Sequence, residues 1–364
     1  MVFVNPTTGK QVLTILELEG MYPDTTLEDA IFAAQSPHAH DYEVRFVRGN
    51  LSVGGDGPMM GIESLSDELC KSVDGLMVFR HYLTRKDIDR FTQCKVVVRM
   101  GVGYDRLDRV ALGERNITVC NVPDYGTNEI ADHALALALS LRRGILLHHE
   151  LQRSDPPAPW QVIDTPLVSR LQKAVFGIVG LGRIGTAVAL RAKAFGWDVI
   201  FYDPYLSNGV DKALQLTRVR SLAELFQRAS TVSLHCPHTR ETRRLIDSSL
   251  LSLLQPGSVL INTSRGEVVD LDGVEEALRS GKLAGVALDV LPVEPIPDDE
   301  GAVHPLIKAY RAKDEWLRGR MVLTPHSAFH SPESLFDIRI KSAQTMREVL
   351  IDGLDTNVIL PTME

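Results

Sequence analysis

Strand-like and helix-like segments alternate along almost the whole chain, and this alternation constrains the fold most. Apolar and β-branched runs that predict strands lie at 12–18, 43–47, 75–79, 95–100, 118–122, 174–179, 198–202, 231–236, 258–263, 283–290 and 321–324. Patterns that predict helices lie at 65–73, 84–91, 107–115, 126–151, from 184 onward, and at 331–352. Such alternation is typical of parallel α/β sheets. The continuous apolar runs of the later strands fit a sheet that helices cover on both faces.

Three segments interrupt the alternation. Residues 155–159 hold three prolines, which cannot continue a helix and predict a linker. The glycine-rich segment 49–61 predicts a surface loop. The charged insertion 296–320 is predicted to be a surface loop with a short helix or, less favoured, an arm that binds a partner. A length of 364 residues fits two domains.

Composition excludes several classes of protein. The chain has 39 Lys and Arg against 47 Asp and Glu, a net charge of −8, which speaks against direct binding of nucleic acid or of an anionic membrane. The longest apolar run, 134–139, is too short to span a bilayer, and no signal peptide is visible. The four cysteines lack metal-site spacing and predict buried, reduced thiols, so no metal is expected. We expect an intracellular protein, in the cytoplasm or the nucleus.

The segment GLGRIG at 180–185 has the form GxGxxG between a predicted strand and a predicted helix. In this context the glycines allow a tight turn, close approach of a pyrophosphate and packing of the helix, whose N-terminus faces the phosphates. Asp203 ends the next predicted strand, where an acid binds ribose hydroxyls and repels a 2′-phosphate, so NAD is favoured over NADP. The alternative is an ordinary strand–helix turn with a loop aspartate. The expected cofactor contacts are Gly180, Leu181, Gly182, Arg183, Ile184, Gly185 and Asp203.

Arg265, Glu294 and His326 each follow a predicted strand, at the edge where open α/β sheets bind ligands. Each alone is more often a surface or turn residue. Together they suit hydride transfer to a 2-keto acid, because Arg265 can orient the carboxylate with its planar fork. His326 can protonate the alkoxide, since histidine has a reference pKa of about 6.5, and Glu294 can hold the imidazole.

Five segments resemble the D-isomer-specific 2-hydroxyacid dehydrogenases, and most of all their C-terminal-binding protein branch. They are 177–205, 234–237 (LHCP), 262–270 (NTSRGEVVD), 285–295 (GVALDVLPVEP) and 324–328 (TPHSA). The resemblance implies a Rossmann-type doubly wound parallel sheet inserted into a second, flavodoxin-like α/β domain. The substrate domain is then residues 1–123 and 327–364, and the NAD-binding domain is 124–326, set between helices 126–151 and 331–352.

The resemblance supports the roles of Arg265, Glu294 and His326 and implies further contacts. For the cofactor they are Thr127, Pro237, Thr242, Thr263, Ser264 and Asp289, of which Asp289 corresponds to the acid that binds the nicotinamide carboxamide. For the substrate they are Arg99, Gly101, Val102, Gly103 and Phe329. Phe329 stands where the branch has a tryptophan, and Val102 where it has a small polar residue, which puts the substrate preference in doubt.

Two functions remain open. The first is an NAD-dependent D-2-hydroxyacid dehydrogenase that acts on a small 2-keto or 2-hydroxy acid, as a homodimer by resemblance. The second is a corepressor-like scaffold in which NAD drives dimerisation and a groove binds peptide motifs. The chain ends at Glu364 without the long tail of the animal corepressors, and its first eighty residues match the branch only loosely. These features favour the enzyme, and the intact Arg–Glu–His set disfavours a silent NAD-binding relative.

Overall fold

The chain divides into two compact units that interrupt one another in sequence. The computed structural model describes residues 4–34, 41–51 and 61–360. Unit 1 comprises Met1–Tyr125 and Ser331–Glu364, and unit 2 comprises Gly126–His330. The boundaries expected after residues 123 and 326 lie two and four residues earlier than these. Most of the glycine-rich loop expected at 49–61 lies outside the described residues.

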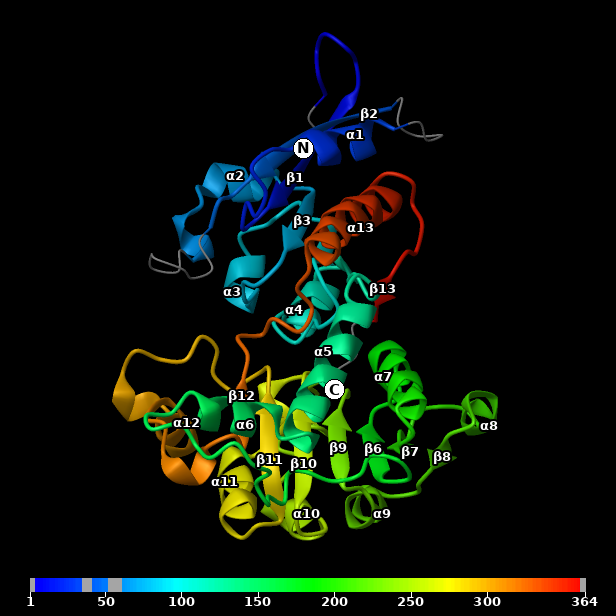
Figure 1. The fold of residues 1–364 in the computed structure, drawn as a ribbon. Coiled ribbons are helices and arrows are strands. Elements are labelled where there is room, and N and C mark those ends of the chain that lie inside the picture. The colour runs from blue at the N-terminus through cyan, green and yellow to red at the C-terminus, as the bar shows by residue number, and fades with distance from the viewer. Residues whose placement is uncertain (1–3, 35–40, 52–60, 361–364) are drawn as a thin grey trace. The chain divides into compact units, whose positions relative to one another are not determined.

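Unit 2 is built on a seven-stranded parallel sheet (Figure 1). Its strands are β6 (Val175–Val179), β7 (Asp198–Tyr202), β8 (Thr217–Arg218), β9 (Thr231–Leu234), β10 (Ser258–Asn262), β11 (Leu283–Leu288) and β12 (Met321–Leu323). The order β12-β11-β10-β9-β6-β7-β8 reverses direction between β9 and β6. This is the doubly wound Rossmann order, so the fold prediction is confirmed and ligands are expected at the carboxyl ends of β6 and β9.

Helices cover both faces of this sheet. They are α5 (Thr127–Arg142), α6 (Ile145–Gln152), α7 (Arg183–Ala194), α8 (Val210–Leu214), α9 (Leu222–Arg228), α10 (Ser248–Ser252), α11 (Leu271–Arg279) and α12 (Pro305–Arg311). Val259 and Ile261 of β10 pack in the core with α5 and α7, whereas Leu260 packs in the opposite core with α9, α10 and α11. Burial on both faces explains the continuous apolar runs.

One prediction about the helices was wrong. The single helix expected at 126–151 is divided into α5 and α6, because Gly144 adopts a left-handed conformation with φ of 61° and ends the hydrogen-bond ladder. The buried residues of α7 are Gly185, Val188, Ala189 and Ala192, whereas Phe195, which follows the last turn, is 51% exposed.

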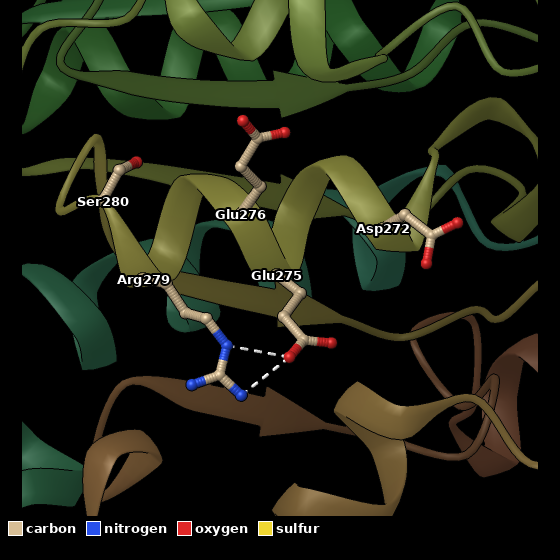
Figure 2. A pocket seen from close by; sticks show the side chains of 5 residues that line it. All are labelled: Asp272, Glu275, Glu276, Arg279 and Ser280. Carbon is tan, nitrogen blue, oxygen red and sulfur yellow. Dashed lines mark hydrogen bonds and ion pairs between the residues drawn. The ribbon is translucent and has the colours of Figure 1, made fainter.

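The insertion 296–320 folds onto unit 2 rather than projecting from it. Leu306 and Ile307 of α12 are buried in the core that α11 lines. His304 Nε2 lies 3.1 Å from Asp272 Oδ1 at the start of α11, and the Arg279 guanidinium lies 4.0 Å from the centre of the Trp316 ring. Figure 2 shows the charged face of α11, where Glu275 and Arg279 pair across one turn beside a shallow hollow. These contacts support the surface loop with a short helix.

Unit 1 holds a six-stranded sheet made from both ends of the chain. Its strands are β1 (Gln11–Glu17), β2 (Tyr42–Arg48), β3 (Gly75–Val78), β4 (Val96–Arg99), β5 (Thr118–Cys120) and β13 (Val358–Ile359). The order is β13-β5-β4-β3-β1-β2, parallel except for the antiparallel β13. The β2-β1-β3-β4-β5 core is the flavodoxin-like order. Neither β13 nor α1 was among the elements predicted from the sequence.

The helices of unit 1 are α1 (Thr26–Ala33), α2 (Asp67–Ser72), α3 (Arg85–Ile88), α4 (Arg109–Glu114) and α13 (Pro332–Leu350). Ser331 caps α13 through a capping box with Ser334, and Pro332 occupies its first position. On α13, Ile338, Ala343 and Met346 are buried, and the helix packs on β3, β4 and α1. The last helix is therefore part of the core of unit 1.

Candidate active site

The glycine turn between β6 and α7 leaves bare backbone at the point where the sheet order reverses. Gly180 has φ of 87°, and a Cβ there would come within 3 Å of the Cys236 backbone. A Cβ on Gly185 would overlap the carbonyl oxygen of Gly180, whereas one on Gly182 would enter open space. Leu181 buries its side chain, so it can offer only backbone to a ligand. The turn thus fits a pyrophosphate at the N-terminus of α7, where Arg183 is exposed and Ile184 half-buried.

Asp203 joins the glycine turn to the end of β7. Its Oδ2 accepts the Leu181 N–H at 2.9 Å, and its Oδ1 accepts the Tyr205 N–H at 3.0 Å. The carboxylate is therefore fixed beside the turn. This is the position from which an acid contacts the adenosine ribose in doubly wound folds.

Two buried threonine hydroxyls mark further places for a polar ligand. Thr127 Oγ1, in the first turn of α5, and Thr263 Oγ1, just after β10, have no hydrogen-bond partner among the described residues. A buried hydroxyl without a partner is costly, so such groups are commonly satisfied by a ligand or water. Both residues were expected to contact the cofactor. With the open glycine turn, these hydroxyls fit a dinucleotide.

His326 and Glu294 form a close pair on neighbouring loops. His326 Nδ1 lies 2.7 Å from Glu294 Oε2, while Glu294 Oε1 accepts the Leu291 N–H at 2.8 Å. Because a carboxylate only accepts, Nδ1 carries a proton and Nε2 is the nitrogen available for exchange with a substrate. The side chain of His326 is 32% exposed. The pair therefore has the arrangement of a positioned acid/base.

Asp289, which follows β11, organises the loop that carries His326. The carboxylate accepts the Ser327 N–H and the Ala328 N–H, each at 2.9 Å, and a hydrogen bond from Thr324 Oγ1 at 2.5 Å. Asp289 is 2% exposed. The expected contact of this residue with the nicotinamide stays a prediction, and the structure adds a role in holding the loop.

The loop after β10 is organised by Asn262. Its Nδ2 donates to the Arg265 carbonyl at 2.8 Å, and its Oδ1 accepts from the Ser264 N–H and Ser264 Oγ. Arg265 is half-buried, and its Nη1 donates to the Ser264 carbonyl at 2.8 Å. The fully buried Asn262 was missed as a functional residue, although it lies within the quoted motif NTSRGEVVD.

Three more predicted contacts lie on loops of unit 2. Phe329 is buried, and its ring lies edge-on to His326 with 6.4 Å between ring centres. Thr242 Oγ1 donates to the Pro237 carbonyl at 2.6 Å and closes the loop after β9. Phe329 is thus brought next to the acid/base pair, and Pro237 and Thr242 to each other.

The comparisons with known proteins agree with this geometry. The family model described as "D-isomer specific 2-hydroxyacid dehydrogenase, NAD binding domain" matches residues 135–328, more than half of the chain. A glyoxylate reductase from Korarchaeum cryptofilum is 36% identical over 260 residues, which cover 71% of this chain and 72% of that protein. The chain belongs to the D-isomer-specific 2-hydroxyacid dehydrogenases. NAD is the cofactor of this family domain.

Two further proteins are similar to this chain. C-terminal-binding protein 1 of Caenorhabditis elegans is 35% identical over 286 residues, which cover 78% of this chain but only 38% of that protein. The solved structure of an acyclic imino acid reductase in complex with NADPH and D-Arg has a TM-score of 0.77 at 25% identity, covering 96% of this chain and all of that one. Because the solved structure contains NADPH, likeness of fold does not by itself select between NADH and NADPH.

The predicted substrate residues of this dehydrogenase-family chain lie mainly in unit 1. Arg99, at the end of β4, donates from Nη1 to the Met100 carbonyl at 2.9 Å and stands 5.9 Å from the centre of the Phe79 ring. Gly101 has φ of 146°, and a Cβ there would overlap the Arg99 guanidinium. The Val102 carbonyl accepts from Asn121 Nδ2, which fixes the turn that continues to Gly103.

Glu19 is a buried acid of unit 1 that was not predicted as a functional residue from the sequence. It follows β1 and accepts the N–H groups of Phe79, Arg80 and His81 at 2.7–2.9 Å, as well as His81 Nδ1 at 2.9 Å. Burial acts to raise the pKa of Glu19, but these hydrogen bonds outweigh it and the pKa lies below its usual value. The signal was present, because Glu19 directly follows the first predicted strand.

Cys236 and His235, which lie beside the glycine turn, are uncharged near neutral pH. Burial raises the pKa of the Cys236 thiol to about 12 and lowers the pKa of His235 to about 3. Cys70, Cys94, Cys120 and Cys236 are all buried and free, as predicted. Within residues 4–34, 41–51 and 61–360, no three metal-ligating side chains gather, and no helix is long and apolar enough to span a membrane.

Proposed function

We propose that the chain is an NAD-dependent dehydrogenase that interconverts a 2-keto acid and a D-2-hydroxy acid. The observation that carries the proposal is the 2.7 Å contact between His326 Nδ1 and Glu294, with Glu294 itself held by the Leu291 N–H. A histidine fixed in this way presents Nε2 in one orientation for exchange of a proton with a substrate. A structural histidine would not need an anchored partner at 32% exposure.

Each proposed role follows from the chemistry of the side chain. When bound, NADH supplies the hydride. In reduction His326 gives the Nε2 proton to the developing alkoxide, and in oxidation it takes that proton back. Arg265 binds the substrate carboxylate through its planar guanidinium and so orients the carbonyl. Glu294 keeps Nδ1 protonated in both directions.

The substrate is proposed to be a small 2-keto acid. Arg99 and the turn of Gly101, Val102 and Gly103 that follows it are assigned to its carboxylate, since a guanidinium suits an anion. Phe329 is assigned to the wall of the substrate pocket because it lies beside His326. The similarity to a glyoxylate reductase makes glyoxylate the first substrate to test.

NADH is proposed to bind in preference to NADPH. Asp203 is held by the Leu181 and Tyr205 N–H groups and stays close to the glycine turn, where its charge would repel a 2′-phosphate. Thr127, Thr263 and Ser264 are proposed as further cofactor contacts, the first two through their buried hydroxyls.

A second candidate is a scaffold that resembles the C-terminal-binding proteins, and the 35% identity over 286 residues favours it. This function predicts an NAD-dependent homodimer that binds peptide motifs and does not need turnover. The His326–Glu294 pair does not separate the two functions. The enzyme is preferred because the match to the glyoxylate reductase covers 72% of that protein, whereas the match to C-terminal-binding protein 1 covers 38%.

The test measures NADH oxidation with glyoxylate, pyruvate, and branched and aromatic 2-keto acids, and determines the configuration of the product. The dehydrogenase predicts turnover with a D product in the wild type and loss of at least a hundredfold in kcat/KM in His326→Gln. The control is His149→Gln on α6, a histidine outside the site, which should keep wild-type activity. An inactive wild type, an L product or an active His326→Gln would overturn the proposal. An inactive chain that dimerises only with NAD and binds peptides would support the scaffold.

A further inference from the structure

His133 reaches from helix α5 to the segment that carries His326. Its Nε2 lies 3.1 Å from Thr324 Oγ1 and 3.8 Å from Asp289 Oδ1. The side chain is 26% exposed, and α5 packs on β10 and β11 (Figure 1). Neither His133 nor Thr324 was predicted as a functional residue from the sequence.

The direction of these hydrogen bonds follows from the groups involved. Thr324 has one hydroxyl proton, and the ionised Asp289 carboxylate, 2.5 Å away, can only accept it. Thr324 Oγ1 must then accept from His133, so Nε2 of His133 carries a proton. The hydrogen bonds therefore all run in one direction, from His133 on α5 through Thr324 to the buried carboxylate of Asp289.

The carboxylate passes this restraint to the backbone around His326. Asp289 accepts the Ser327 and Ala328 N–H groups through its side chain, and its backbone carbonyl accepts the His326 N–H at 2.8 Å. His326 has φ of 52°, in the left-handed region that is strained for a residue with a side chain. A conformation of this kind persists only where the surrounding contacts hold it.

We propose that His133 is a positioning residue, which acts through Thr324 and Asp289 to hold the left-handed turn that presents His326. The proposal rests on the proposed function only for the role of His326 in proton transfer. His133 touches neither His326 nor Glu294 in any described contact, so its effect passes through the backbone. Its loss should lower kcat and leave substrate binding nearly unchanged.

The kinetic test compares two pairs of variants. His133→Ala removes the donor, and Thr324→Val removes the link; each is expected to lower kcat about tenfold with KM changed less than about threefold. His133→Gln keeps an N–H donor at similar reach, and Thr324→Ser keeps the hydroxyl, so both should recover most of kcat. The control is His149→Ala on α6. Unchanged kcat in His133→Ala, or no recovery in His133→Gln, would overturn the proposal.

Hydrogen exchange followed by mass spectrometry tests the same link without turnover. In His133→Ala the peptide spanning 324–330 should exchange about tenfold faster, while peptides of β6 and α7 exchange as in the wild type. Equal exchange at 324–330 would overturn the proposal even if kcat fell. If the wild type turns over no 2-keto acid, the proposed function fails, and this measurement still decides whether His133 holds the turn.

Discussion

The carboxyl edges of the two sheets carry a similar arrangement of a buried carboxylate and a loop, but the histidine beside it differs in its surroundings. At each edge a buried carboxylate follows a strand and gathers backbone N–H groups from a neighbouring loop: Asp289 in unit 2 and Glu19 in unit 1. In unit 1 the nearby imidazole of His81 bonds to that same carboxylate and is buried. In unit 2 the loop presents His326 to a second carboxylate, Glu294, and leaves it partly exposed.

A buried carboxylate holds the backbone of a neighbouring loop at both edges. What distinguishes the edge of unit 2 is the second, separately anchored acid. We therefore expect changes in unit 2 to affect the rate of proton transfer, and changes in unit 1 to affect stability and the shape of the loop after β3.

The largest effect is expected for His326→Gln. Because glutamine cannot exchange a proton, kcat/KM should fall about 10²- to 10⁴-fold, while the Kd for NADH stays within about twofold. In Glu294→Gln the fall in kcat/KM should be smaller, because the imidazole remains and loses only the carboxylate that holds it. Steady-state kinetics and fluorescence titration with NADH measure the two quantities. Equal losses of NADH affinity and rate would mean that the pair serves cofactor binding instead.

The next effect is a loss of stability in Glu19→Gln. Replacing a charged acceptor of four hydrogen bonds should cost unit 1 about 2–3 kcal/mol. Because the pKa of Glu19 is lowered on folding, this contribution is present above pH 4.5 and is lost as the pH falls further. All three tryptophans, Trp160, Trp197 and Trp316, lie in unit 2.

Two probes of urea unfolding therefore separate the units. Circular dichroism should report the earlier transition of unit 1 in Glu19→Gln, while tryptophan fluorescence should report an unchanged unit 2. A wild-type transition by both probes would contradict the role given to Glu19.

Glu17, two residues before Glu19, is expected to have the opposite effect on the pH dependence of stability. Burial, with smaller contributions from Glu28 and Glu19, raises the pKa of Glu17 from 4.5 to about 7, although the Met21 N–H and Arg48 act to lower it. A raised pKa means that the wild type loses stability as the pH rises from 4.5 to 7. Glu17→Gln should therefore stabilise the protein by an amount that grows over this range and reaches at most about 3 kcal/mol above pH 7. Unfolding midpoints at pH 5 and pH 8 check this, and a gain that shrinks with pH would contradict it.

The smallest effect concerns the cofactor. Asp203→Ser removes the charge beside the glycine turn, and the ratio of the Kd values for NADPH and NADH should fall about 10- to 100-fold. Asp198→Ser, at the exposed start of β7, is the matched control and should leave the ratio unchanged. A wild type that already prefers NADPH would contradict the role of Asp203.

Much of unit 2 could be predicted because its signals are local. The glycine turn, the strand before it and Asp203 lie within about 30 residues, and each glycine answers a close approach that the structure shows. Glu294 and His326 are 32 residues apart, and their contact was predicted through strand ends and resemblance together.

The remainder depends on tertiary contacts that leave no periodic signal. His133 looks like an ordinary residue of an apolar helix until Thr324 is brought beside it. Glu19 resembles a surface acid at a strand end, and only the loop from 79 to 81 makes it a buried acceptor. The break at Gly144 was missed because a single glycine within an apolar pattern is compatible with a continuous helix.

The layout of unit 1 also sets the order in which the protein can be made. The ribosome completes residues 126–330 before α13 and β13 exist, so unit 2 has its whole sheet while unit 1 still lacks its last helix. Gly75 of β3 packs so closely on Met346 that α13 is needed to close this core. During synthesis an apolar face of the first 125 residues therefore stays uncovered until α13 is made. Binding of a chaperone during this time would protect the chain from aggregation.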